Sequence, residues 1–147
     1  MYPENSRERP DYYFQQSAVI PYRCAAGTIE VMLVTSRNKR RWIIPKGIVE
    51  PFMSAAESAR KEAHEEAGID GEVSPASVGA YAYEKWGGVC SVEVFTMRVT
   101  EEQPVWEESF RDRRWFSVPE AAALLKEPAL KELVSALPAT IGQHPNE

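Results

Sequence analysis

The sequence predicts one α/β domain in which a mixed β-sheet is packed by helices. Three observations lead to this fold class. The chain has 147 residues, a length that suits a single domain. Segments typical of strands and helices follow one another in the order strands, helix, strands, helix. No repeat or linker interrupts this order, so we expect a domain at residues 17–137, between a loose N-terminal arm (1–16) and a polar tail (138–147).

Composition and charge limit the classes of protein to which this chain can belong. Hydrophobic residues make up 44% and charged residues 27% of the chain, a balance that supports an ordinary core. The net charge of -5 argues against a general nucleic-acid binder, but a local basic patch can still bind a small anionic ligand. No apolar run is long enough to span a membrane, and we expect a cytoplasmic protein. Cys24 and Cys90 lack metal-ligand spacing and are expected to be buried free thiols.

Three strands are expected before the first helix. Residues 17–26 form an apolar run that Pro21 interrupts, which favours an edge or bulged strand. Residues 29–36 are rich in β-branched and apolar side chains and predict a second strand. A polar, basic loop then leads to a short third strand at residues 42–45.

A loop at residues 46–53 precedes the central helix. Ser54 and Glu57 have the spacing of a capping box, which predicts a helix at residues 55–67. Gly68 suits the left-handed conformation that ends many helices. Glu57 also stands four residues before a lysine, in the favourable order for an exposed ion pair. A stripe of small residues on this helix suits close packing against a sheet: Ala56, Ala59, Ala63 and Ala67.

The second half of the chain continues the pattern. Residues 77–85 and 89–99 are expected to form a hairpin through Gly87 and Gly88. The remaining expected elements are a strand at residues 113–118, a helix at 118–126 with Pro119 in its first turn, and a third helical segment at 127–138.

The central helix carries three like charges on one edge. Glu62, Glu65 and Glu66 fall within about 100° of arc, where like-charged neighbours four residues apart destabilise a helix by about 0.2–0.5 kcal/mol. The helix dipole also disfavours anions in the last turn. A divalent cation would reverse the sign of this interaction, and Mg²⁺ prefers carboxylate oxygens. The cluster alone leaves two interpretations, a metal site and a solvated acidic face.

The spacing around this cluster resembles the Nudix box, G-x5-E-x7-R-E-U-x-E-E-x-G-U, in which U is a bulky apolar residue. The positions that match are Gly47, Glu62, Glu65, Glu66, Gly68 and Ile69. The resemblance implies a Nudix-type α/β/α sandwich with a mixed sheet. It also implies hydrolysis of a nucleoside diphosphate linked to another moiety, or of a related pyrophosphate, with Mg²⁺ or Mn²⁺ as cofactor.

Two positions depart from the Nudix box. Met53 stands where the family has its first glutamate, and Lys61 stands where it has arginine. Ala63 is also smaller than the usual apolar residue. In the family the first glutamate and the arginine are thought mainly to brace the loop against the helix, whereas the later glutamates bind metal. The pattern therefore favours an active enzyme with an altered brace, in which Glu57 or Glu65 is a candidate partner for Lys61.

Segments outside the box narrow the resemblance to a subgroup. The sequences VMLVTSR and WIIPKGIVEP resemble Nudix enzymes that act on dinucleoside polyphosphates and diphosphoinositol polyphosphates, and RRWFSVPEAAALL resembles the usual final strand and helix of the fold. In that subgroup a Ser-Arg pair reaches substrate phosphates. We expect phosphate contacts from Arg37 and Lys46, with Ser36 and Arg23 behind them. Trp86 is a candidate for stacking on a nucleobase, and its alternative role is to pin a loop.

The resemblance also implies the chemistry of the site. Cations held by Glu62, Glu65 and Glu66 would clamp the phosphates and lower the pKa of a bound water. The Gly47 carbonyl is implied as a further ligand. The general base stays open among these acids: Glu65, Glu66, Glu84, Glu107 and Glu108.

Other functions are weighed against this one. Met53 and Lys61 motivate a non-catalytic Nudix-like nucleotide-binding module. A Nudix hydrolase of the nucleoside diphosphate-sugar or ADP-ribose type is a further alternative, and the net charge of -5 disfavours RNA decapping. The expected partner is a small-molecule polyphosphate, and the oligomeric state is open, with a homodimer among the alternatives.

Overall fold

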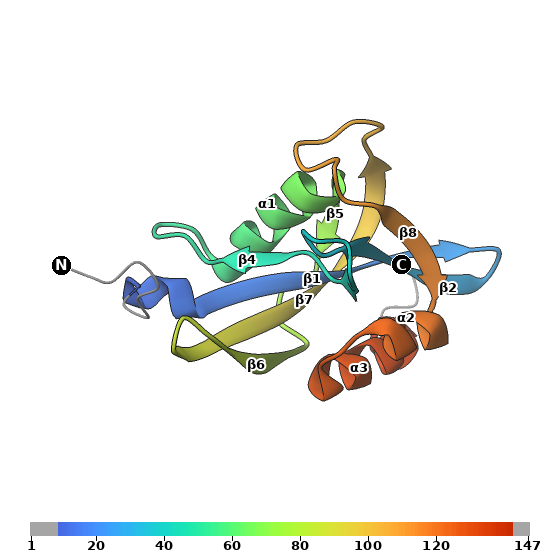
Figure 1. Ribbon diagram of the computed structural model, residues 1–147. Coiled ribbons are helices and arrows are strands. Elements are labelled where there is room, and N and C mark those ends of the chain that lie inside the picture. Colours follow the sequence, from blue (N-terminus) through green and yellow to red (C-terminus); the bar gives the residue numbers. More distant parts are fainter. Residues whose placement is uncertain (1–8, 143–147) are drawn as a thin grey trace.

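The computed structural model describes residues 9–142, which form one mixed eight-stranded sheet with helices on both faces (Figure 1). The α/β class predicted from the sequence is confirmed. Helix α1 covers one face of the sheet, and α2 to α4 cover the other. The elements are η1 (Asp11–Phe14), β1 (Gln15–Ala25), β2 (Thr28–Thr35), β3 (Trp42–Ile43), β4 (Lys46–Ile48), α1 (Ala55–Ala67), β5 (Ile69–Val73), β6 (Gly79–Lys85), β7 (Gly88–Glu102), β8 (Arg113–Ser117), α2 (Val118–Leu124), α3 (Pro128–Ser135) and α4 (Leu137–Gly142).

Pro21 led to the prediction of an edge or bulged strand. The edge alternative was wrong, because β1 lies at the centre of the sheet, and the ladder between β1 and β7 passes through Pro21 without a change of register. β1 pairs in parallel with β7 on one side and antiparallel with β4 and β2 on the other. The Val19 N–H donates to the Pro45 carbonyl at 3.2 Å, and alternation places the Pro21 nitrogen on this same side. β4 pairs with residues 16–18 and β2 with residues 22–25. Pro21 falls between these two partners, where its missing N–H costs no ladder bond.

Two short strands were not predicted. β4 lies in the segment expected to be a loop, and its three residues pair with β1. β5 begins directly after Gly68 and pairs with β7. The predicted hairpin is confirmed, but its turn residues are Trp86 and Gly87, with φ angles of 55° and 73°. Two positive φ angles are what a two-residue hairpin turn requires, and they shift the turn one residue towards the N-terminus.

Helix α1 has the ends and the packing face that the sequence predicts. Ser54 and Glu57 form the reciprocal capping box, and Gly68 ends the helix with a φ of 65°. Ala59, Ala63 and Ala67 are fully buried against the sheet. The expected ion pair between Glu57 and a lysine is absent from the described residues, because the Glu57 carboxylate accepts the Ser54 N–H instead. The helix is therefore fixed at both ends by local interactions.

Other predictions from composition have mixed outcomes. Both cysteines are free; Cys90 is buried as expected, whereas Cys24 is exposed. Among residues 9–142, no helix is long and apolar enough to cross a membrane. The predicted arm and tail lie partly outside residues 9–142. The described part of the arm contains η1 and the start of β1, and the described part of the tail belongs to α4.

Candidate active site

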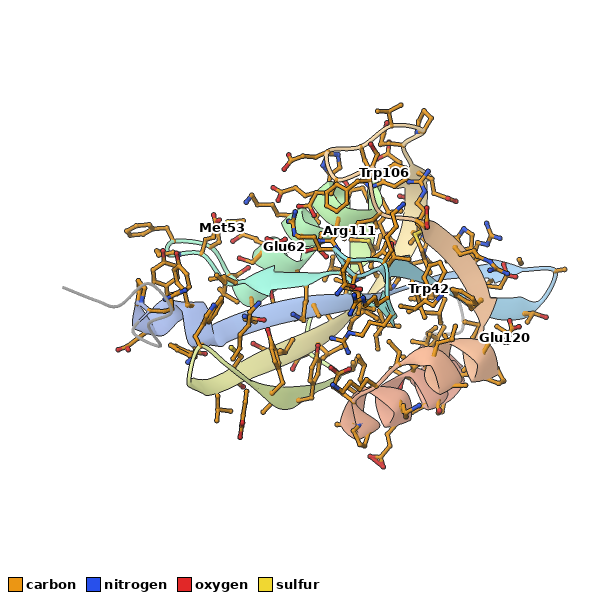
Figure 2. The ribbon with its side chains drawn as sticks, in the orientation of Figure 1. Trp42, Met53, Glu62, Trp106, Arg111 and Glu120 are labelled. Atoms are coloured by element: carbon orange, nitrogen blue, oxygen red, sulfur yellow. The ribbon has the colours of Figure 1, made fainter. Side chains whose placement is uncertain are left out.

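Two of the predicted metal ligands converge on strand β4. The carboxyl group of Glu62, a residue labelled in Figure 2, lies against Gly47. A Cβ atom built on Gly47 would come 2.3 Å from Glu62 Cδ. Any larger side chain at this position would displace that carboxylate. Glu66 is buried and accepts a hydrogen bond of 3.2 Å from the Lys46 backbone N–H. Both glutamates therefore contact the short strand β4, Glu62 at Gly47 and Glu66 at Lys46.

Burial makes these two carboxyl groups reluctant to ionise. Desolvation, followed by the charge of Glu62, raises the pKa of Glu66 to about 8. Desolvation, followed by the charge of Glu65, raises the pKa of Glu62 to about 7. A buried pair of anions is costly without a compensating charge, and a bound divalent cation would supply that charge. The donor set, the buried carboxylate of Glu66 and the half-buried carboxylate of Glu62 beside a strand without a side chain at Gly47, fits a hard cation such as Mg²⁺.

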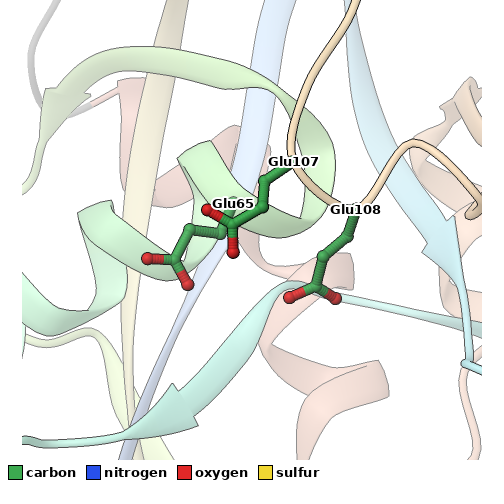
Figure 3. A group of neighbouring side chains, drawn as sticks. All are labelled: Glu65, Glu107 and Glu108. Carbon is green, nitrogen blue, oxygen red and sulfur yellow. The ribbon is translucent and has the colours of Figure 1, made fainter.

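The third glutamate of the helix, Glu65, lies near the loop that joins β7 to β8. Its carboxylate lies in a cluster with Glu107 and Glu108, and one oxygen from each residue falls within 4.8 Å of the others (Figure 3). Glu107 and Glu108 belong to the loop between β7 and β8, residues 103–112. Glu107 and Glu108, two of the predicted candidates for the general base, therefore lie next to Glu65. Glu84 is an exposed residue of β6, outside this cluster.

Backbone contacts fix the 103–112 loop to the last turn of α1. The Glu108 N–H donates to the Glu65 carbonyl at 3.0 Å, and the Trp106 indole N–H donates to the Glu66 carbonyl at 2.9 Å. Arg111 is buried and donates to Glu108 Oε1 through Nη2 at 2.8 Å. The bonds from Glu108 and Trp106 satisfy two carbonyls that a helix C-terminus would otherwise leave without partners.

Lys61 links the loop before α1 to the metal-ligand side of the helix. Its Nζ lies 3.4 Å from Glu50 Oε1 and 3.2 Å from Glu65 Oε2. Glu65 was one of the two partners expected for Lys61. Glu50 was not predicted, and it supplies from the loop an acid that Met53 cannot supply. The loop is therefore braced in this chain by a Glu50–Lys61 pair.

We expect Glu50→Gln to loosen this loop without unfolding the protein. The pair is partly exposed, so its loss should lower the free energy of unfolding by no more than about 1 kcal/mol. Amide hydrogen exchange should accelerate at residues 49–54. Introducing Met53→Glu into the Glu50→Gln variant restores an acid to the loop and should slow that exchange. Unchanged exchange in Glu50→Gln would show that Glu50 is not a brace.

The Lys46 side chain points to the opposite face of the sheet from Glu62. Its Nζ donates to the Tyr83 hydroxyl at 3.1 Å, and that hydroxyl donates to Gln16 Oε1 at 2.8 Å. Burial lowers the pKa of Lys46. Tyr83 also stacks with Tyr81 at a ring-centroid distance of 6.4 Å. This face combines one partly buried cation with aromatic rings.

The other predicted phosphate contacts lie in two regions. Ser36 and Arg37 belong to the β2–β3 loop, where the Ser36 hydroxyl donates to Asn38 at 2.9 Å. Arg37 is 75% exposed and reaches to within 3.9 Å of Glu108, beside the acidic cluster. Arg23 lies elsewhere: it pairs with Glu30 at 2.8 Å and stacks on an indole ring of β8.

Trp86 contacts the N-terminal segment. Its ring lies 5.4 Å from that of Tyr13 and 5.9 Å from that of Phe14, both in η1. Arg9 and Lys85 place cations 5.6 and 4.7 Å from the same ring. These contacts correspond to the pinning role considered for Trp86.

Sequence comparison identifies relatives of this chain. A family model of the NUDIX domain matches residues 15–137. Nudix hydrolase 21, chloroplastic, from Arabidopsis thaliana is 32% identical over 131 residues, which cover 84% of this chain and 66% of that protein. Diphosphoinositol polyphosphate phosphohydrolase 3-alpha from Homo sapiens is 28% identical over 120 residues, which cover 80% and 72%. This chain thus spans about two thirds of the length of the plant relative.

Structural comparison supports the same fold. The C. elegans Ap4A hydrolase superposes with a TM-score of 0.72 at 23% identity, covering 86% of this chain and 97% of the other. At this level of identity the likeness concerns the fold.

Proposed function

This chain belongs to the Nudix family, and we propose that it hydrolyses a phosphoanhydride bond in a small-molecule polyphosphate with Mg²⁺ or Mn²⁺. The observation that carries this proposal is the convergence of Glu62 and Glu66 on β4, where burial raises the pKa of both carboxyl groups. A cation there would neutralise the phosphates and activate water. A cytoplasmic location and a homodimer stay predictions.

We assign the backbone ligand to Lys46 rather than to Gly47. The Val49 N–H donates to the Gln15 carbonyl at 2.8 Å, and the Pro45 carbonyl accepts from β1, so alternate residues of β4 face that strand. Gly47 shares this orientation and pairs with β1. The Lys46 N–H points the other way, to Glu66, and its carbonyl shares that direction. Glycine is needed at position 47 for the space beneath Glu62.

We propose Glu108 as the general base. A base must be held where it can accept the proton of the attacking water. Arg111 binds only one oxygen of the Glu108 carboxylate and leaves the other free to accept. Arg111 is itself anchored by a 2.9 Å hydrogen bond to the Thr35 carbonyl. Glu65, in the same cluster, is taken as a metal ligand.

The surroundings of Lys46 favour a dinucleoside polyphosphate as substrate. Tyr83 presents an aromatic ring beside this cation, with Lys46 Nζ 4.7 Å from the ring centroid, which suits a nucleobase next to a phosphate. Three cations of the 36–41 loop already have acidic partners within 4 Å: Arg37 with Glu108, Lys39 with Asp112, and Arg41 with Glu127. These pairings reduce the basic surface that a diphosphoinositol polyphosphate would need.

A substrate panel with product analysis tests this proposal. Diadenosine tetraphosphate, a diphosphoinositol polyphosphate, ADP-ribose and capped RNA should be compared at saturating Mg²⁺. The highest kcat/KM is expected for diadenosine tetraphosphate, with no turnover in EDTA. A preference for the inositol compound would overturn the assigned substrate. Tight nucleotide binding without any turnover would instead support the non-catalytic module that Met53 and Lys61 motivate.

A further inference from the structure

Ser17 is a buried hydroxyl without a hydrogen-bond partner. It lies in the central strand β1 and is fully buried. Within residues 9–142, its Oγ and the Trp115 indole nitrogen are the buried side-chain atoms for which no partner is found. An unsatisfied buried polar group destabilises the folded state, because it has lost its hydrogen bonds to water without gaining others. Alanine would fill nearly the same space without this cost, so the hydroxyl calls for an explanation.

The fold places Ser17 beside the glutamates of the box. Ser17 pairs directly with Gly47 in the β1–β4 ladder, and paired residues direct their side chains to the same face. On that face, the Cβ direction of Gly47 meets the carboxyl group of Glu62. Alternation along β1 agrees, because Gln16 bonds to Tyr83 on the opposite face, whereas Val19 packs in the core beneath α1.

We propose that Ser17 is a positioning residue of the metal site, whose hydroxyl donates to the Glu62 carboxylate when a cation is bound. This inference rests on the proposed function and deepens it. The hydroxyl would fix the orientation of a ligand that has no side chain beneath it at Gly47. Groups that hold a metal ligand in place change metal affinity or activity by about 10–100-fold when removed.

The test compares Mn²⁺ binding in the wild type and in Ser17→Ala by calorimetry. We expect the Kd for Mn²⁺ to rise by about 10-fold or more in Ser17→Ala. The metal-free variant should be at least as stable as the wild type in urea, because the unsatisfied hydroxyl is gone. A purely structural serine would give the reverse, a less stable protein with unchanged Mn²⁺ affinity.

Trp115→Phe is the matched control. It removes the other unpartnered buried polar atom, which lies in β8 next to Arg23, outside the acidic site. Its Kd for Mn²⁺ should equal that of the wild type. If the wild type binds Mn²⁺ and Ser17→Ala binds it equally well, the role of Ser17 is overturned while the proposed function stands. If the wild type itself binds no Mn²⁺, both are overturned.

Discussion

Replacing Glu66 by glutamine should reduce hydrolysis by more than about 100-fold while leaving the fold intact. Groups that merely hold a metal ligand cost up to this much when removed, and Glu66 is assigned as a ligand itself. Glutamine keeps the volume of the side chain and an oxygen that can accept the Lys46 N–H. It also removes a carboxyl group that burial makes costly to ionise, so the metal-free variant should be no less stable than the wild type. Steady-state kinetics at saturating Mg²⁺ and thermal unfolding measure the two effects.

Two further variants make this result specific. Glu132→Gln removes the same charge from an exposed position on α3 and should leave kcat unchanged. Gly47→Ala retains every carboxylate but places a Cβ where Glu62 now lies, so it should weaken Mg²⁺ activation in the same direction. Full activity in Glu66→Gln would remove the basis for the metal site on α1.

Local signals in the sequence carried most of the prediction for α1. The capping box depends on residues three positions apart, Ser54 and Glu57, and the helix end depends on one glycine. Such interactions form within a single turn and do not depend on the rest of the fold. The same local competition explains one error. Glu57 is held by Ser54, so Lys61 pairs instead with Glu65 and with Glu50, an acid eleven positions away in the loop.

Contacts between distant segments could not be derived from spacing. Glu108 lies more than forty positions after Glu65, yet its N–H donates to the Glu65 carbonyl. The i,i+3 spacing of Glu108 and Arg111 was the one local signal for this loop, and the sequence does not say that Arg111 is buried. Glu107 and Glu108 were named as candidate acids from their residue type, and the fold decides which glutamate of α1 they meet.

Residues 46–53 were predicted to form a loop, and this error prevented a prediction of how the side chains around Gly47 are directed. Because β4 was not recognised, the alternation that turns Gly47 towards Glu62 and Lys46 towards Tyr83 was not available. For the same reason the position of Ser17 near Glu62 could not be predicted, because it follows from the pairing of Ser17 with Gly47 in β4. A three-residue strand with Pro45 directly before it and Pro51 shortly after it has too little period-2 pattern to be identified from sequence.

Without metal, the protein should lose stability as the pH rises from about 5 to about 9. Desolvation, and then the repulsion of neighbouring carboxylates, raises the pKa of Glu62 to about 7 and of Glu66 to about 8, from the ordinary value of 4.5. Between these values the folded state binds more protons than the unfolded state, so the free energy of unfolding falls with increasing pH. Each pKa unit corresponds to about 1.4 kcal/mol, and the two groups titrate as a coupled pair.

Bound Mg²⁺ should reverse this trend, because it binds only the ionised carboxylates of the folded state. Urea unfolding at pH 5.5 and pH 8.5, with EDTA or with Mg²⁺, measures both effects. The double variant Glu62→Gln/Glu66→Gln isolates the pair, because the titration of all other groups is retained in it. Its metal-free stability should fall less than that of the wild type between the two pH values, and Mg²⁺ should not change it. An equal pH dependence in the two proteins would show that these carboxyl groups are not the buried, charge-repelling pair on which the site depends.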